Sequence, residues 1–118
     1  TFGGSHLACA ASIAVLEVIE KEDLMANASK IEAYFLEAIK VIPEITKVKG
    51  RGLMLGVEFD FDVSALRKKM IIEKHIFTGG SSNKNLLRIL PPLTITTAAI
   101  DTFILALQES LSELKNSN

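Results

Sequence analysis

The sequence predicts an α+β domain, in which a mixed or antiparallel sheet carries helices on one side. Helical spacing of apolar residues occupies both ends of the chain, whereas short β-prone segments separated by glycines fill its middle. The composition, 48% hydrophobic and 23% charged, is ordinary for a globular protein, and 118 residues suffice for one domain. The predicted order of elements is α-α-β-β-α-β-β-α.

The first predicted helix runs from Ser5 or His6 to about Lys21. Ser5 is its expected N-cap, because a serine hydroxyl can accept a hydrogen bond from a free N–H of the first turn. Residues 7–16 are apolar nearly all round, which is typical of a helix buried on several sides. We therefore expect this helix to meet a partner surface beyond the chain, with Cys9 as a small core residue rather than a nucleophile.

The second predicted helix follows Asp23, its expected N-cap, and continues to about Val41. Pro43 ends it, because proline cannot continue a helix. Apolar residues recur at helical spacing and polar residues fall elsewhere, which predicts an amphipathic surface helix. The apolar positions are Leu24, Ala28, Ile31, Phe35, Ala38, Ile39 and Ile42.

A β-hairpin is predicted next, with strands over residues 45–49 and 53–59. The connecting residues, Gly50-Arg51-Gly52, resemble an anion-binding nest, but a hairpin turn that needs positive φ is the simpler interpretation. A short helix is predicted next, over residues 63–74. The basic run 67–69 (RKK) is expected on the solvated face of that helix.

Two further strands and the most regular helix complete the chain. A strand is predicted over residues 76–78, and another over residues 86–90, which Pro91 stops. The loop between them, residues 79–85, is expected to be solvated, since it lacks the Lys-Ser/Thr pair of a P-loop. Thr96 is the expected N-cap of the last helix, whose apolar residues recur at steps of three and four.

Composition excludes several classes of function. The formal net charge of −1 offers no electrostatic footprint for nucleic acid or an anionic membrane. No apolar run approaches the ~20 residues that span a bilayer. The single cysteine excludes an internal disulfide and fits a reducing compartment, so we expect a cytoplasmic protein. His6 and His75 share no ligand cluster, and no metal site is expected.

Arg88 is the strongest candidate for a site residue. Its guanidinium interrupts an apolar strand, Leu-Leu-Arg-Ile-Leu, directly before Pro-Pro. Arginine keeps its charge, and its planar fork matches a carboxylate in a bidentate pair. One interpretation is therefore recognition of a substrate carboxylate. The other, which the isolated pattern favours, is that strand alternation points Arg88 to solvent from an edge strand.

The first residues form a second candidate site. Thr1 and the glycines at positions 3 and 4 precede a helix, and such a turn offers a hydroxyl and free N–H groups to a phosphate. Taken alone, a Gly-Gly turn is the more common interpretation. Because a chain would rarely begin on such a turn, we expect a fragment whose missing N-terminal part holds much of the chemistry.

Three segments together resemble one family. Residues 1–11 (TFGGSHLACAA) are similar to the Thr-Phe-Gly-Gly-Asn-Pro-Leu-Ala-Cys-Ala-Ala segment of class III, pyridoxal-phosphate-dependent aminotransferases. Residues 50–58 (GRGLMLGVE) resemble their Gly-x-Gly-Leu-Met-x-Gly strand, and residues 87–93 (LRILPPL) resemble their Arg-x-x-Pro-Pro-Leu segment. Each motif is loose, but the three in order are specific. The subgroup that they resemble most is acetylornithine aminotransferase, with its succinylornithine-using relatives.

The resemblance implies a fold-type I enzyme that uses pyridoxal 5'-phosphate. It implies transfer of the δ-amino group of N-acetyl- or N-succinylornithine to 2-oxoglutarate, in arginine biosynthesis. Residues 1–22 would be an inter-domain helix with a phosphate-contacting start, and residues 23–118 a C-terminal small domain. In the implied homodimer, Thr1 contacts the cofactor phosphate of the neighbouring subunit, and Arg88 binds a substrate carboxylate.

Two departures limit what the resemblance implies. Ser5 and His6 stand where the family has Asn-Pro, and no role is expected for His6. The Schiff-base lysine belongs to an upstream part of the family, so this chain would hold no catalytic residue and would be inactive alone. Ornithine and 4-aminobutyrate aminotransferases remain alternatives. So does a free-standing, non-catalytic α+β interaction module that docks through its first helix.

Overall fold

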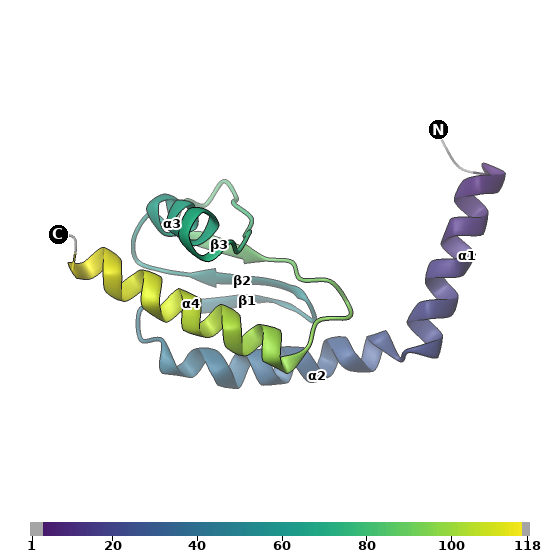
Figure 1. The fold of residues 1–118 in the computed structure, drawn as a ribbon, viewed down its shortest axis with the longest axis horizontal. Helices are drawn as coiled ribbons and strands as arrows, with labels where there is room; N and C mark the ends of the chain where they lie inside the picture. The colour runs from purple at the N-terminus through teal and green to yellow at the C-terminus, as the bar shows by residue number, and fades with distance from the viewer. Residues whose placement is uncertain (1–3, 117–118) are drawn as a thin grey trace.

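The computed structural model describes residues 4–116 and has four α-helices and three strands in that range (Figure 1). The elements in chain order are α1 (His6–Lys21), α2 (Leu24–Ala38), the 3₁₀ turn η1 (Ile39–Val41), β1 (Lys47–Arg51), β2 (Met54–Glu58), α3 (Ser64–Lys74), β3 (Leu86–Ile89) and α4 (Thr97–Asn116). The predicted α+β class is confirmed.

The three strands form an antiparallel sheet in the order β1-β2-β3. Strand alternation places Leu55 and Val57 of β2 and Leu87 and Ile89 of β3 on the same, buried face. Helices α2 and α4 lie across one side of the sheet (Figure 1), and they bury their own apolar stripes there. The prediction of helices on one side of the sheet is therefore correct.

Aromatic and aliphatic side chains fill the space between these layers. Phe35 of α2 and Phe103 of α4 approach each other with ring centroids 6.2 Å apart, a separation at which tilted rings attract. Leu66 and Met70 close the core from α3 and are fully buried. One continuous core thus joins α2, α3, α4 and the sheet.

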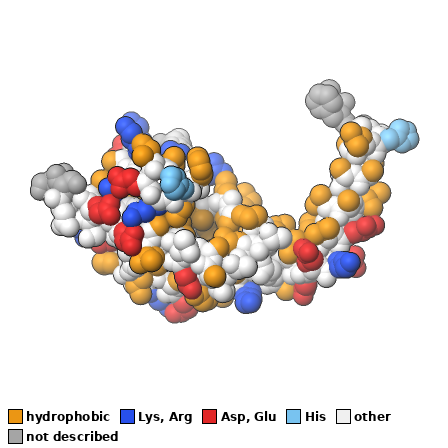
Figure 2. All heavy atoms as spheres, viewed as in Figure 1, with side chains coloured by type: hydrophobic (Ala, Val, Ile, Leu, Met, Phe, Trp, Pro, Cys, Tyr) orange, Lys and Arg blue, Asp and Glu red, His pale blue; other side chains and the backbone are white. Residues whose placement is uncertain are grey.

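Helix α1 stands away from this core (Figures 1 and 2). It has no buried residue, and the cysteine expected to be a core residue, Cys9, is exposed. A turn at Asp23, which has φ of 51°, separates α1 from α2. The predicted burial of α1 is not met within the described chain, because apolar character all round a helix specifies burial but not which segment provides it.

Both helix caps that were predicted at serine and threonine are confirmed. The Ser5 hydroxyl accepts a hydrogen bond from the Ala8 N–H at 3.5 Å, and the Thr96 hydroxyl accepts one from the Ala99 N–H at 3.3 Å. Asp23 precedes α2 as predicted, but its side chain makes no capping hydrogen bond because its backbone adopts the left-handed conformation.

The hairpin turn lies two residues later than predicted. Arg51 pairs with Met54, so Gly52 and Leu53 form the two-residue turn, and Gly52 has φ of 58°. Gly50 falls within β1 instead, with φ of 99°, where an added Cβ would lie 1.9 Å from the Met54 carbonyl oxygen. Gly50 is therefore required for two reasons, its positive φ and the close approach of the Met54 carbonyl within the hairpin.

Two predictions about the second half of the chain were wrong. Residues 76–78 form no strand; the segment meets the sheet only through an isolated bridge between Gly79 and Arg88. The basic run on α3 is not uniformly solvated either. Arg67 and Lys69 are partly buried, because long basic side chains can lay their stems on the core and extend their polar ends to partners.

Candidate functional site

Arg88 lies in the middle of β3 and projects from the sheet face opposite the core. Its neighbours in the strand, Leu87 and Ile89, are buried on the inner face, whereas Arg88 is exposed. Period-two alternation therefore explains how an arginine stands within an apolar strand. The outward orientation expected from strand alternation is confirmed, although β3 is not a free edge at this point, and recognition of a substrate carboxylate stays a prediction.

Glycines flank Arg88 on both sides. Gly56 of β2 is its partner in the sheet register, and Gly79 pairs with it from the other side. The Gly79 N–H donates to the Arg88 carbonyl oxygen at 2.8 Å, and the Arg88 N–H donates to the Gly79 carbonyl oxygen at 3.0 Å. A Cβ built at Gly79 would lie 3.1 Å from the Arg88 Cβ. The two glycines thus leave the arginine side chain without lateral neighbours of its own size.

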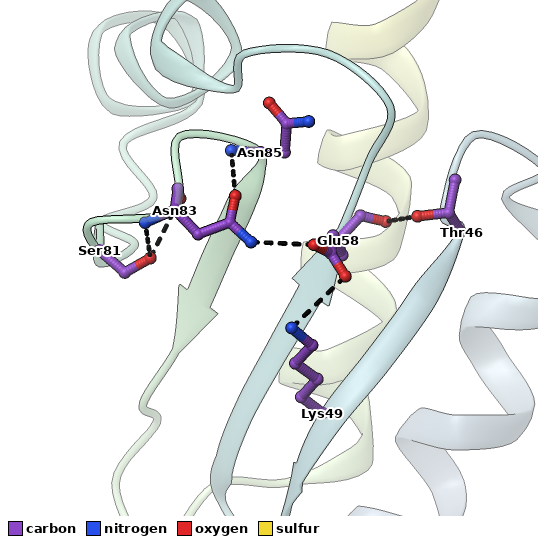
Figure 3. Close-up of polar contacts among 6 residues, drawn as sticks. All are labelled: Thr46, Lys49, Glu58, Ser81, Asn83 and Asn85. Carbon is purple, nitrogen blue, oxygen red and sulfur yellow. Dashed lines mark hydrogen bonds and ion pairs between the residues drawn. The ribbon is translucent and has the colours of Figure 1, made fainter.

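The Arg88 guanidinium also has no acidic partner among the residues that the structure describes. Glu58 is the carboxylate of β2 on the same sheet face, and it is already engaged (Figure 3). It accepts a hydrogen bond from the Asn83 amide at 2.9 Å and forms an ion pair with Lys49 at 3.6 Å. Arg88 therefore keeps its charge available for an external anion.

The pKa of Glu58 is consistent with its binding to Asn83 and Lys49 rather than to Arg88. The hydrogen bond from Asn83, aided by the nearby charges of Lys49 and Lys47, lowers the pKa of the Glu58 carboxyl below its ordinary value. Glu58 thus stays ionised and bound to these groups over the physiological range. It does not neutralise Arg88.

The loop beside Arg88 is more structured than the solvated loop that was predicted. Asn83 joins the loop to β2, because its side-chain amide donates a hydrogen bond to Glu58 (Figure 3). Within the loop, the Asn83 side-chain oxygen accepts from the Asn85 N–H at 3.0 Å, and the Asn83 backbone N–H donates to the Ser81 hydroxyl at 3.1 Å. The Asn85 carbonyl in turn accepts from Phe59 at 2.9 Å. This network fixes residues 81–85 against the end of β2.

Sequence reasoning missed Arg67 and the two flanking glycines. Arg67 donates from Nη2 to the Thr78 carbonyl oxygen at 3.1 Å, directly before Gly79. The available signal was Gly56, since a glycine inside an apolar strand often marks a close approach. No comparable signal identified Arg67, because the Thr78 carbonyl is a backbone group and every sequence has one.

The second predicted site cannot be evaluated at Thr1, which lies outside the described residues. The described start of α1 does suit an anion: Gly4 has φ of 83°, and the N–H groups of His6 and Leu7 have no acceptor among residues 4–116. This start lies far from the sheet in Figure 1. One chain therefore does not bring it together with Arg88.

Lys69 and Lys74 of α3 are unsuited to carry a carbonyl cofactor. Hydrogen bonds with Glu113 and then Glu73 raise the pKa of Lys69, and a hydrogen bond with Glu109 raises the pKa of Lys74. A Schiff-base lysine requires the opposite, an amine that loses its proton readily. Within the described part of the chain there is also no group of His, Cys, Asp and Glu that could hold a metal ion, and no helix that could cross a membrane.

A family model and individual relatives both show similarity to aminotransferases. The family model described as Aminotransferase class-III matches residues 1–111. The chain is 34% identical to the acetylornithine aminotransferase of Caldanaerobacter subterraneus, over 98% of this chain and 30% of that protein. It is 40% identical to ornithine aminotransferase 2 of Staphylococcus aureus, over 86% of this chain and 26% of that protein.

A solved structure extends the similarity to the fold. A structure of the ornithine aminotransferase of Toxoplasma gondii, with PLP partially occupying its active site, superposes with a TM-score of 0.84 at 28% identity. The match covers 99% of this chain and 29% of that one. The chain thus spans about 30% of the length of the relatives that it matches.

Proposed function

The chain belongs to the class III aminotransferase family, and we propose that it is the C-terminal small domain of a pyridoxal-phosphate-dependent enzyme. The proposed reaction moves the δ-amino group of N-acetyl- or N-succinylornithine to 2-oxoglutarate in arginine biosynthesis, in the cytoplasm. The similarity to acetylornithine aminotransferase over 98% of the chain supports this choice of donor.

The unpaired guanidinium of Arg88 carries the proposal. It is exposed on β3, glycines flank it, and no described carboxylate neutralises it. A bidentate pair with a substrate carboxylate would supply two charge-assisted hydrogen bonds and fix the orientation of the substrate. Arg88 is thus proposed to bind the carboxylate of the acceptor.

The proposed enzyme also implies a division of this chain after residue 22. Residues 1–22 are proposed as the inter-domain helix and residues 23–118 as the small domain; the turn at Asp23 and the separate core support this division. Pyridoxal phosphate, when bound, supplies the electron sink for the reaction. Thr1 and the N–H groups that start α1 are proposed to hold its phosphate across a homodimer interface.

This division of labour makes the chain inactive alone. The two least exposed lysines of α3, Lys69 and Lys74, have raised pKa values, whereas a Schiff-base amine needs a lowered one. The lysine is proposed to lie in the part of the enzyme that the relatives have and this chain does not span. If the complete reading frame contains no large domain with such a lysine, the proposal fails.

Arg88→Lys tests the site in the full-length enzyme. Lysine keeps the charge but replaces the planar fork with a point charge, so the KM for 2-oxoglutarate should rise roughly tenfold or more. Steady-state kinetics at varied 2-oxoglutarate measure the change, with Arg51→Lys, an exposed arginine of the hairpin, as the control. Unchanged kinetics for Arg88→Lys would remove Arg88 from the site.

An ornithine aminotransferase is the second candidate, because the Staphylococcus aureus relative with that name is 40% identical. Comparison of kcat/KM for N-acetylornithine, N-succinylornithine, free ornithine and 4-aminobutyrate separates the candidates. We expect the acylated donors to be preferred.

The exposed apolar α1 supports a further alternative, a non-catalytic module that docks through this helix. The mass of the native gene product distinguishes it from the enzyme. A product several times heavier than the 12.8 kDa of this chain would exclude the free-standing module.

A further inference from the structure

We propose that Arg67 of α3 is a positioning residue for Arg88. Its guanidinium holds the segment Thr78–Gly80 against β3, and this segment borders Arg88 on the side away from β2. The inference rests on the proposed function in one respect, the role of Arg88 in binding a carboxylate. It adds a residue whose contribution neither the motifs nor the relatives indicate.

The segment beside Arg88 has little support from the sheet itself. Gly79 meets β3 through an isolated bridge of two backbone hydrogen bonds, and no regular strand extends on either side of it. An isolated bridge lacks the neighbouring ladder bonds that normally restrain a strand. Side-chain contacts must therefore supply the remaining restraint on this edge.

Arg67 supplies such contacts on both sides of Gly79. Its Nη2 donates a partly buried hydrogen bond to the Thr78 carbonyl oxygen at 3.1 Å. Its Nη1 lies so close to Gly80 that a Cβ built there would be 2.6 Å away. The planar guanidinium thus lies along the segment, and the absence of a side chain at residue 80 is what makes room for it.

An ordinary structural ion pair does not account for Arg67. The other partly buried cations of α3 have acidic partners: Lys69 pairs with Glu113 at 2.8 Å and Lys74 with Glu109 at 2.7 Å. Arg67 has no acidic partner within residues 4–116, and its Nε is buried without a hydrogen bond. A partly buried cation without a counterion is costly for stability, and the hydrogen bond to the Thr78 carbonyl is the contact that offsets part of this cost.

The consequence for Arg88 follows from the bridge. Arg88 donates to and accepts from Gly79, so displacement of Gly79 shifts the backbone that sets the direction of the Arg88 side chain. Loss of the Arg67 contact should loosen this bridge while β2 and β3 remain paired. The substrate carboxylate would then meet a guanidinium that is less well oriented.

The first test compares two variants of the full-length enzyme, Arg67→Met and Lys68→Met. Both remove one positive charge from α3, but Lys68 is exposed, and the side-chain hydrogen bond from α3 to this segment comes from Arg67. Arg67→Met should raise the KM for 2-oxoglutarate about fivefold, whereas kcat should stay within about twofold. Lys68→Met should change neither. Equal effects of the two variants, or a fall in kcat alone, would overturn the proposal.

A double-mutant cycle with Arg88 separates positioning from general destabilisation. If Arg67 acts through Arg88, adding Arg67→Met to Arg88→Lys should raise the KM by less than about twofold. A multiplicative effect, with Arg67→Met acting as strongly in both backgrounds, would contradict the proposal. The same cycle distinguishes failure of this proposal from failure of the proposed function. If Arg88→Lys has no effect, the role of Arg88 is refuted, rather than that of Arg67.

Gly80→Ala provides a second variant that keeps Arg67 in the chain. The added Cβ should displace the flexible end of the guanidinium from Thr78, so this variant should raise the KM in the same direction as Arg67→Met. In the Arg67→Met background, where no guanidinium is present, Gly80→Ala should have no further effect.

Hydrogen exchange of the full-length protein gives a readout independent of activity. Amides of residues 76–90 should exchange faster in Arg67→Met and Gly80→Ala than in Lys68→Met. Unchanged exchange in this segment would overturn the proposal, whatever the kinetics show.

Discussion

Helices α1 and α4 are both long and rich in apolar residues, but they have opposite surroundings. Helix α4 buries seven residues, among them Phe103 and Leu107, whereas α1 buries none. The apolar residues of α4 form one stripe, and a single stripe is satisfied by one layer of neighbours. Those of α1 surround the helix, and the rest of the described chain buries none of them. Apolar content thus shows that a helix needs neighbours, and only its distribution shows on how many sides.

The largest difference between the two helices should appear on truncation of one leucine in each. Leu107→Ala in α4, at a fully buried position, should lower the free energy of unfolding of the chain by about 2–5 kcal/mol. Leu16→Ala in α1, where the side chain is 63% exposed, should change it by less than about 0.5 kcal/mol. Urea unfolding of the 118-residue chain measures both, and leucine and alanine have similar helix propensities. A large loss for Leu16→Ala would mean that α1 packs against something in solution, such as a second copy.

This contrast also explains how much of the fold the sequence predicts. Local signals were sufficient for the helices, for the caps at Ser5 and Thr96, and for the presence of the hairpin, although not for the position of its turn, because each depends on residues close together in the chain. The bridge at Gly79 depends on a contact between two segments that no local pattern encodes. The same reason applies to the site: alternation predicts that Arg88 faces outward, but only the fold brings Arg67 beside it.

Removal of the two confirmed N-caps should also affect α1 and α4 differently, with a smaller change in the free energy of unfolding. Thr96→Ala should destabilise the whole domain by about 1 kcal/mol, because α4 cannot fray at its start without loosening the core. Ser5→Ala should leave the urea midpoint unchanged and only accelerate amide exchange in the first turn of α1, since no buried contact depends on that turn. Equal midpoint shifts for the two variants would show that α1 and the core unfold as one unit.

The smallest expected effect is a change in the free energy of unfolding with pH, which should involve ion pairs of α4 and none of α1. Hydrogen bonds from Lys69, aided by the charge of Lys74, lower the pKa of Glu113 in the folded chain. A carboxyl whose folded pKa is lowered stabilises the fold above its unfolded pKa, about 4.3 for glutamate, and this contribution is lost as the pH falls through the folded value. No ion pair among residues 4–116 involves α1.

Urea midpoints between pH 7 and pH 3, for the original chain and for Glu113→Gln, measure this contribution. The original chain should lose more stability than the variant over that range, because the variant lacks the carboxyl that becomes protonated. The difference should be small, since the Glu113 side chain itself is 45% exposed, and salt screens its pairs with the partly buried lysines. If both proteins lose stability in parallel, the contacts between α3 and α4 are held by Leu66, Met70 and their apolar neighbours alone. The ion pairs of Lys69 and Lys74 would then keep the two basic side chains in place without adding to the stability of the core.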